Sequence, residues 1–125
     1  MPSYSQHLAK VRSNLGFVEF LLKSRAGFLD WAITGYFYSA VHLVEAYFDK
    51  LFGKHYGSHP DRRRAIACDA NLSALYSCYR QLETYSRVAR YGIKHFDDKY
   101  INARVMPQFR KFRAAVEALH PDLRT

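Results

Sequence analysis

The most constraining feature of this sequence is an apolar stretch from Phe28 to Phe52 whose hydrophobic residues repeat at helical spacing on two faces. One stripe consists of Trp31, Thr34, Tyr38, Val41, Val44, Phe48 and Leu51, and the second of Ile33, Tyr36, Ala40, Leu43 and Tyr47. A helix that is apolar on two faces must be covered on two sides. It is therefore either central in a bundle or shared between its own bundle and a second subunit. We favour sharing, because a single layer of four helices has little interior.

The segment before this stretch predicts a helix from about residue 4 to residue 24, followed by a turn at 25–27. Ser3 and Gln6 have the spacing of a capping box, in which two side chains satisfy free amides at a helix start. A single apolar stripe follows at three- and four-residue steps: Leu8, Val11, Leu15, Val18 and Leu22. This pattern is typical of an amphipathic helix that packs one face on a core.

The segment after the apolar stretch predicts two further helices. Residues 53–59 form a loop, and Ser58 or His59 caps the third helix, with Pro60 and Asp61 in its first turn. The periodicity weakens at 69–71, which predicts a bend or break. It then resumes with Leu75, Tyr79, Leu82, Ser86 and Ala89 on one face and Arg80, Glu83, Arg87 and Arg90 on a polar face.

Gly92 is expected to end the third helix in a left-handed conformation. Residues 97–99 read as a polar loop, and the fourth helix is expected to start near Asn102 or just before Pro107. Its apolar stripe is Val105, Phe109, Phe112, Val116 and Leu119, and it ends at His120.

These patterns predict an all-α chain with a single domain over residues 1–125. The expected architecture is an up-and-down bundle of four main helices, with the third bent or split and short extra helical turns. No apolar run approaches the roughly 20 residues that span a bilayer, and the N-terminus lacks a signal-peptide pattern. We therefore expect a soluble cytoplasmic protein with no membrane partner.

Positive charge is concentrated in one part of the chain. The net charge is +8, and residues 62–113 contain twelve Lys or Arg against four Asp or Glu, whereas residues 1–61 contain six against five. A concentrated positive field favours a phosphate-bearing partner, although a solvated basic face gives the same composition.

The basic segment contains Arg90-Tyr91-Gly92-Ile93-Lys94-His95, which holds the residue types needed to cleave RNA without a metal. A guanidinium binds phosphate oxygens through paired hydrogen bonds. A histidine exchanges a proton near neutral pH and can act on the 2′-hydroxyl. Taken alone, an arginine and a histidine at this spacing are more often a surface arginine and a loop histidine.

The order of these features resembles that of the HEPN family (higher eukaryotes and prokaryotes nucleotide-binding). The resemblance covers about residues 5–119. It rests on the aromatic second helix, with Tyr38-Ser-Ala-Val-His42 at its centre, and on Arg90 and His95 as the family's Arg-x4–6-His signature after the third helix.

The resemblance implies a metal-independent endoribonuclease of the toxin, defence or RNA-processing type. Two subunits would pair so that both motifs line one cleft, with Arg90 and His95 as catalytic residues. The expected partners are RNA, a second copy of the chain and an antitoxin such as a nucleotidyltransferase. Tyr91 stands where active members often carry a polar residue, so a noncatalytic module that binds nucleotide, RNA or a partner protein remains the alternative.

Other residues are secondary candidates. RNA binding is expected of Arg87, Tyr91, Lys94, Arg62 and Arg63, of which the arginines at 62 and 63 read equally well as a solvated helix start. His42 and Glu45 are three residues apart and either tune His95 or form a buried hydrogen bond between helices. No cofactor and no metal is expected, because no carboxylate or thiol at fixed spacing completes a site with His42, His55 and His59.

Overall fold

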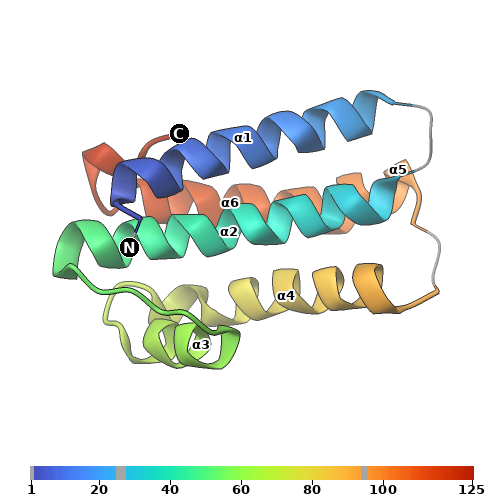
Figure 1. Ribbon diagram of the computed structural model, residues 1–125. Helices are drawn as coiled ribbons and strands as arrows, with labels where there is room; N and C mark the ends of the chain where they lie inside the picture. The colour runs from blue at the N-terminus through green and yellow to red at the C-terminus, as the bar shows by residue number, and fades with distance from the viewer. Residues whose placement is uncertain (1, 25–27, 94–95) are drawn as a thin grey trace.

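The computed structural model describes residues 2–24, 28–93 and 96–125, and the described chain is a helical bundle (Figure 1). Four long helices run roughly alongside one another: α1 (Tyr4–Lys23), α2 (Leu29–Phe52), α4 (Tyr76–Tyr91) and α6 (Met106–Glu117). The shorter α3 (His59–Cys68) packs beside the beginning of α4. The predicted all-α bundle is confirmed. Short 3-10 turns at η1 (Ser73–Leu75) and η3 (Pro121–Leu123) complete the connections.

The centre of the bundle is α2, which packs against α1, α4 and α6. Its two apolar stripes are mostly buried, and Phe37, Leu43 and Tyr47 are fully covered. The helix is thus covered on both sides by helices of its own chain. The reason for expecting α2 to be shared with a second subunit does not hold, because α1 and α6 provide the cover that a single layer would lack.

Helix starts follow the local sequence signals. Ser3 and Gln6 form the predicted capping box of α1. Ser58 caps α3 through a hydrogen bond from the Asp61 amide to its hydroxyl, with Pro60 in the first turn. These side chains satisfy amides that have no partner within the helix.

The predicted break at 69–71 is confirmed, and Asp69 accounts for it. Its carboxylate accepts hydrogen bonds from the amides of Asn71 and Leu72 and from the hydroxyl of Tyr47. A side chain that bonds nearby amides competes with helix formation and favours a turn. The chain therefore leaves α3 at Cys68 and re-enters a helix only after η1.

The expectation that Gly92 ends its helix in a left-handed conformation is wrong. Gly92 ends α4 in an extended conformation (φ −86°, ψ 167°), and the left-handed glycine is Gly53 (φ 62°) at the end of α2. Glycine is still required at position 92, because a Cβ atom there would lie 2.6 Å from the carbonyl oxygen of Val88. Glycine is needed here because the backbone at position 92 passes close to the carbonyl of Val88 in α4, and not because φ is positive.

The last helical segment also begins earlier than expected. Asp97 caps a helical run that starts with α5 (Asp98–Tyr100), continues through a π-helical turn, η2 (Ile101–Val105), and leads into α6. Pro107 lies two residues after the π turn, in the first turn of α6. Proline has no amide to donate, and a locally wider turn accommodates it without a sharp stop. Residues 97–99 are thus a helix start and not a loop.

None of the helices in the described parts of the chain combines the length and the apolar character that crossing a membrane requires.

Candidate functional site

Arg90 lies near the end of α4, with its side chain held between two tyrosines. One terminal nitrogen donates to the hydroxyl of Tyr38 at 3.0 Å, and Nε donates to the carbonyl of Ser86 at 3.4 Å. The guanidinium carbon lies 5.5 Å from the Tyr38 ring centre and 5.2 Å from that of Tyr91, within cation–π range. Arg90 is half-buried, so its position is fixed while part of the group faces solvent.

The other candidate residues around Arg90 divide into two groups: two are exposed, and two lie outside the described residues. Tyr91 is 78% exposed and Arg87 is also exposed, so both are accessible to a large ligand. Lys94 and His95 lie outside the described residues. The geometry of the site is therefore described from Arg90 and its neighbours.

His59 is a histidine near Arg90 that the sequence reasoning did not connect with it. Its ring lies 6.1 Å from the ring of Tyr38, the residue that binds Arg90. Burial lowers the pKa of His59, and the neighbouring arginines, Arg62 and Arg90 among them, lower it further against the opposing effect of Glu83. A neutral imidazole thus stands beside the arginine. No spacing rule pairs residues 59 and 90, since only the packing of α3 and α4 against α2 brings them together.

Arg62 is not available for RNA, which corrects the prediction. It is 7% exposed and donates from Nε to Glu45 Oε1 at 2.8 Å and from another nitrogen to the carbonyl of Tyr56 at 2.7 Å. A third contact joins it to Nδ1 of His59 at 3.2 Å. A buried arginine whose three nitrogens are all engaged stabilises the fold and is poorly placed to bind a phosphate.

Glu83 also departs from its predicted place on a polar face, because it is 3% exposed. Its carboxylate accepts a hydrogen bond from Arg63 at 2.8 Å and another from Arg80. Arg63 is therefore largely committed to an ion pair, although a quarter of its side chain remains exposed. The arginine-rich start of α3 contributes more to internal pairing than to a phosphate-binding surface.

His42 and Glu45 have different partners, so the predicted hydrogen bond between them is replaced by two separate contacts. Nδ1 of His42 lies 2.9 Å from Nδ1 of His7 on α1, and Glu45 binds Arg62. Burial lowers the pKa of His42 to about 4, with smaller contributions from His7, Lys10 and Arg62. Burial also lowers the pKa of His7, against the opposing charge of Glu45. Both imidazoles are neutral at pH 7.

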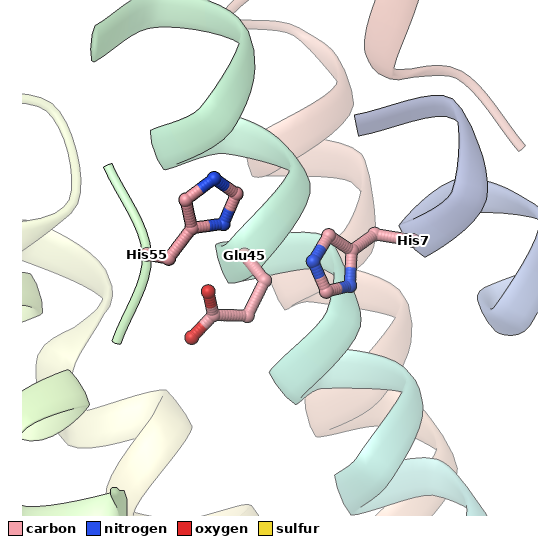
Figure 2. Close-up of side chains that lie close together, drawn as sticks. All are labelled: His7, Glu45 and His55. Atoms are coloured by element: carbon pink, nitrogen blue, oxygen red, sulfur yellow. The ribbon is translucent and has the colours of Figure 1, made fainter. Parts of the chain in front are cut away.

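Glu45 also belongs to a group of possible metal ligands that spacing did not predict. Donor atoms of His7, Glu45 and His55 all lie within 4.8 Å of one another. Figure 2 shows the His7 ring arriving from α1 on one side of Glu45 and the His55 ring arriving from the loop after α2 on the other. Residue spacing does not indicate this group, because its members are 38 and 10 residues apart and come from three different segments.

An open surface pocket of about 470 Å³ adjoins this group. It is lined by Pro2, Gln6, His7, Lys10 and His42. Solvent therefore reaches the region where the His7 and His42 rings meet.

Comparison of the chain with protein-family models, with curated proteins and with solved structures found no match. The residues and their geometry therefore carry the functional argument.

Proposed function

We propose that this chain is a HEPN-type, metal-independent endoribonuclease that acts as a homodimer, with Arg90 and His95 as its catalytic residues. The observation that carries the proposal is the placement of Arg90. Its guanidinium is oriented by Tyr38 and Ser86 yet remains half exposed, at the end of the bundle where Tyr91 and Arg87 face solvent. A fixed, accessible guanidinium is suited to stabilise charge that develops on a phosphoryl group.

The proposed reaction is an internal transesterification of RNA. His95 accepts the proton of the 2′-hydroxyl, whose oxygen attacks the adjacent phosphorus, and the bond from phosphorus to the 5′-oxygen breaks. Arg90 stabilises the negative charge on the non-bridging oxygens. The products are a 2′,3′-cyclic phosphate and a 5′-hydroxyl, the latter receiving a proton from a general acid. The exposed Tyr91 ring offers a face on which an unpaired base can stack.

Dimerisation is proposed through the end of the bundle that carries Arg90. Figure 1 shows that α1 ends, α2 begins and α4 ends at this side of the molecule. These three segments carry most of the large exposed hydrophobic side chains: Phe17, Phe20, Phe28, Trp31, Val88, Tyr91 and Ile93. Large apolar side chains left exposed at one end of a bundle favour an interaction there. A two-fold contact there would bring two copies of Arg90 towards one cleft.

The dimer is tested with Phe20→Glu, which places a charge at a 67% exposed position. Phe52→Glu is the matched control, since Phe52 is 54% exposed at the opposite end of α2. We expect light scattering after size-exclusion chromatography to show a dimer for the wild type and the control, and a monomer for Phe20→Glu. A wild-type monomer at all concentrations would refute the dimer.

The activity is tested by incubating mixed RNAs with wild type, His95→Ala and Arg90→Ala in the presence of a chelator. The wild type is expected to yield cyclic-phosphate ends, and each variant to lose at least about 100-fold in rate, as removal of one transition-state contact does elsewhere. Arg64→Ala is the control, because Arg64 is a 74% exposed arginine that pairs with the neighbouring Asp61 on its own helix. Full cleavage by His95→Ala would rule out the assignment.

The second candidate is a noncatalytic module that binds RNA or nucleotide, or that serves a partner such as a nucleotidyltransferase-type antitoxin. It is favoured by Tyr91 itself, whose exposed ring beside Arg90 suits base stacking without requiring chemistry. This candidate predicts RNA binding that weakens steeply with salt, without products. Arg87→Ala would then reduce the affinity, and His95→Ala would leave it unchanged.

A further inference from the structure

We propose that His7, Glu45 and His55 form a binding site for one divalent transition-metal ion of the zinc class, which ties α1 and the loop after α2 to α2. The site lies about two helical turns along α2 from Tyr38, the residue that holds Arg90. The inference does not rest on the proposed ribonuclease function and assigns no catalytic step to the metal.

The donor set and its geometry fit such an ion. Two imidazoles and one carboxylate are a common ligand set for zinc, with bonds of about 2.0–2.2 Å. In a tetrahedron, bonds of this length place the ligand atoms about 3.4 Å apart. The three donors lie within 4.8 Å of one another, so small side-chain rotations would close them around an ion. Harder ions such as Mg²⁺ and Ca²⁺ prefer all-oxygen sites and do not match two imidazoles.

Two buried nitrogens at this place lack partners among the residues that the structure describes. Nε2 of His7 and Nδ1 of His55 are both inaccessible to solvent and accept or donate no hydrogen bond among the described residues. His7 is 93% buried, since only 7% of it is exposed. Leaving buried polar atoms unpaired is costly, and both belong to rings that flank Glu45 in Figure 2. A metal ion between them would satisfy both nitrogens with one ligand each.

The opposite nitrogen of each ring already has the support that metal-binding histidines need. Nε2 of His55 lies 3.1 Å from the Asp49 carboxylate, and Nδ1 of His7 lies 2.9 Å from Nδ1 of His42. Ligating histidines almost always donate their second N–H to a carboxylate, a backbone carbonyl or water, which fixes the tautomer and the ring orientation, and a neutral His42 ring nitrogen can accept that bond from His7 in the same way. Here the two supporting contacts leave Nδ1 of His55 and Nε2 of His7 as the ligating atoms.

The charge balance permits a cation despite Arg62. Glu45 and Asp49 contribute two negative charges near the site, against one positive charge from Arg62 on Glu45 Oε1. The other oxygen, Oε2, accepts only a long bond of 3.3 Å from the Tyr56 amide among the described residues. A carboxylate oxygen has two lone pairs, so Oε2 can bind a metal while Oε1 remains paired with Arg62. The pocket beside His7 provides a route for the ion.

The test begins with the full chain stripped of metal by a chelator and dialysed. Titration with Zn²⁺ in a calorimeter is expected to show one ion bound per chain. The melting temperature should rise by about 10 °C at a zinc concentration near 100 times Kd. Co²⁺ should give the visible absorption of a four- or five-coordinate nitrogen–oxygen site.

The variants His7→Gln and His55→Gln should each weaken zinc binding at least about 100-fold. Asp49→Asn, which alters the supporting contact to His55 and keeps an oxygen that can accept from the Tyr4 amide, should weaken it about 10–100-fold. His120→Asn is the control, because His120 lies at the start of η3 and asparagine can retain its capping bond to the Asp122 amide. Helix content measured by circular dichroism without metal verifies that each variant is folded.

Absence of stoichiometric binding to the wild type, or equal binding by the His7→Gln/His55→Gln double variant, would overturn the inference. These outcomes are independent of RNA cleavage, which is assayed in chelator. Zinc binding without cleavage would contradict only the ribonuclease proposal, and cleavage without zinc binding only the metal site.

Discussion

Two arginines in this molecule, Arg62 and Arg90, have opposite surroundings. Arg62 is buried and its guanidinium is divided among Glu45, Tyr56 and His59. Arg90 is half-buried, and its side chain binds a tyrosine hydroxyl and a backbone carbonyl, with no carboxylate among these contacts. An arginine paired with a buried carboxylate stabilises the fold. An arginine oriented only by neutral groups keeps its full charge for a ligand, and a positive net charge in the sequence does not distinguish the two cases.

The largest effect on stability is expected from breaking the buried ion pair between Arg62 and Glu45. Arg62→Ala should lower the free energy of unfolding by about 3–5 kcal/mol, because it leaves the carboxylate of Glu45 buried without its partner. Denaturant unfolding followed by circular dichroism measures this loss. Arg64→Ala, on the same helix but exposed, should change stability by less than about 0.5 kcal/mol. Equal effects of the two substitutions would remove the distinction between buried and accessible arginines.

An intermediate effect is expected from the histidines beside the buried network, and it depends on pH. The pKa of His42 falls from 6.5 in the unfolded chain to about 4 in the fold, so the unfolded state binds the proton more readily. Stability is therefore complete above about pH 6.5 and is lost as the pH falls towards 4, by roughly 3 kcal/mol for this group. His42→Gln, measured in chelator, should flatten this part of the stability–pH curve.

That prediction has a direct internal control. His120→Asn alters a histidine whose hydrogen bond and ion pair are with Asp122 and not with His7 or His42, so the loss of stability attributed to His42 should persist in this variant. A wild-type curve that is flat over this range would show that His42 is not protonated differently in the two states.

The smallest effect on stability is expected at Arg90. Tyr38→Phe removes one hydroxyl that accepts from Arg90 and should cost about 1 kcal/mol or less in unfolding experiments. Under the proposed function it should nevertheless slow RNA cleavage by about 10-fold or more, since misplacing a catalytic group is costly. A variant with unchanged cleavage would show that Tyr38 does not orient Arg90 for chemistry.

The sequence predicted the fold well because its signals are local. Apolar stripes at helical spacing identified the long helices and most of their buried residues, and Ser3 and Ser58 identified two helix starts. Where a local signal was ambiguous, the prediction failed. The sequence predicts a left-handed cap at Gly92, whereas this glycine permits a close approach to Val88. It predicts a loop at Asp97, whereas this residue caps a helix.

The candidate site was predicted only in part. A short motif indicates Arg90, but its partner Tyr38 is 52 residues away, and no spacing in the sequence pairs the two residues. The burial of Glu83 is likewise not predicted by the sequence. Its neighbours in the helix pattern are arginines, which indicates a polar face. Arg80 from that pattern and Arg63 from α3 instead bind Glu83 in a buried position.

The sequence by itself therefore determined which segments are helical, where the core stripes lie and where positive charge accumulates, because these depend on neighbours within a few residues. Only the tertiary structure decided which charges are buried and which donor atoms meet. The ion pair of Glu45 with Arg62 and the group of His7, Glu45 and His55 both form between separate segments that α2 brings together. The burial of a charge depends on what packs over it, and that is a property of the assembled bundle.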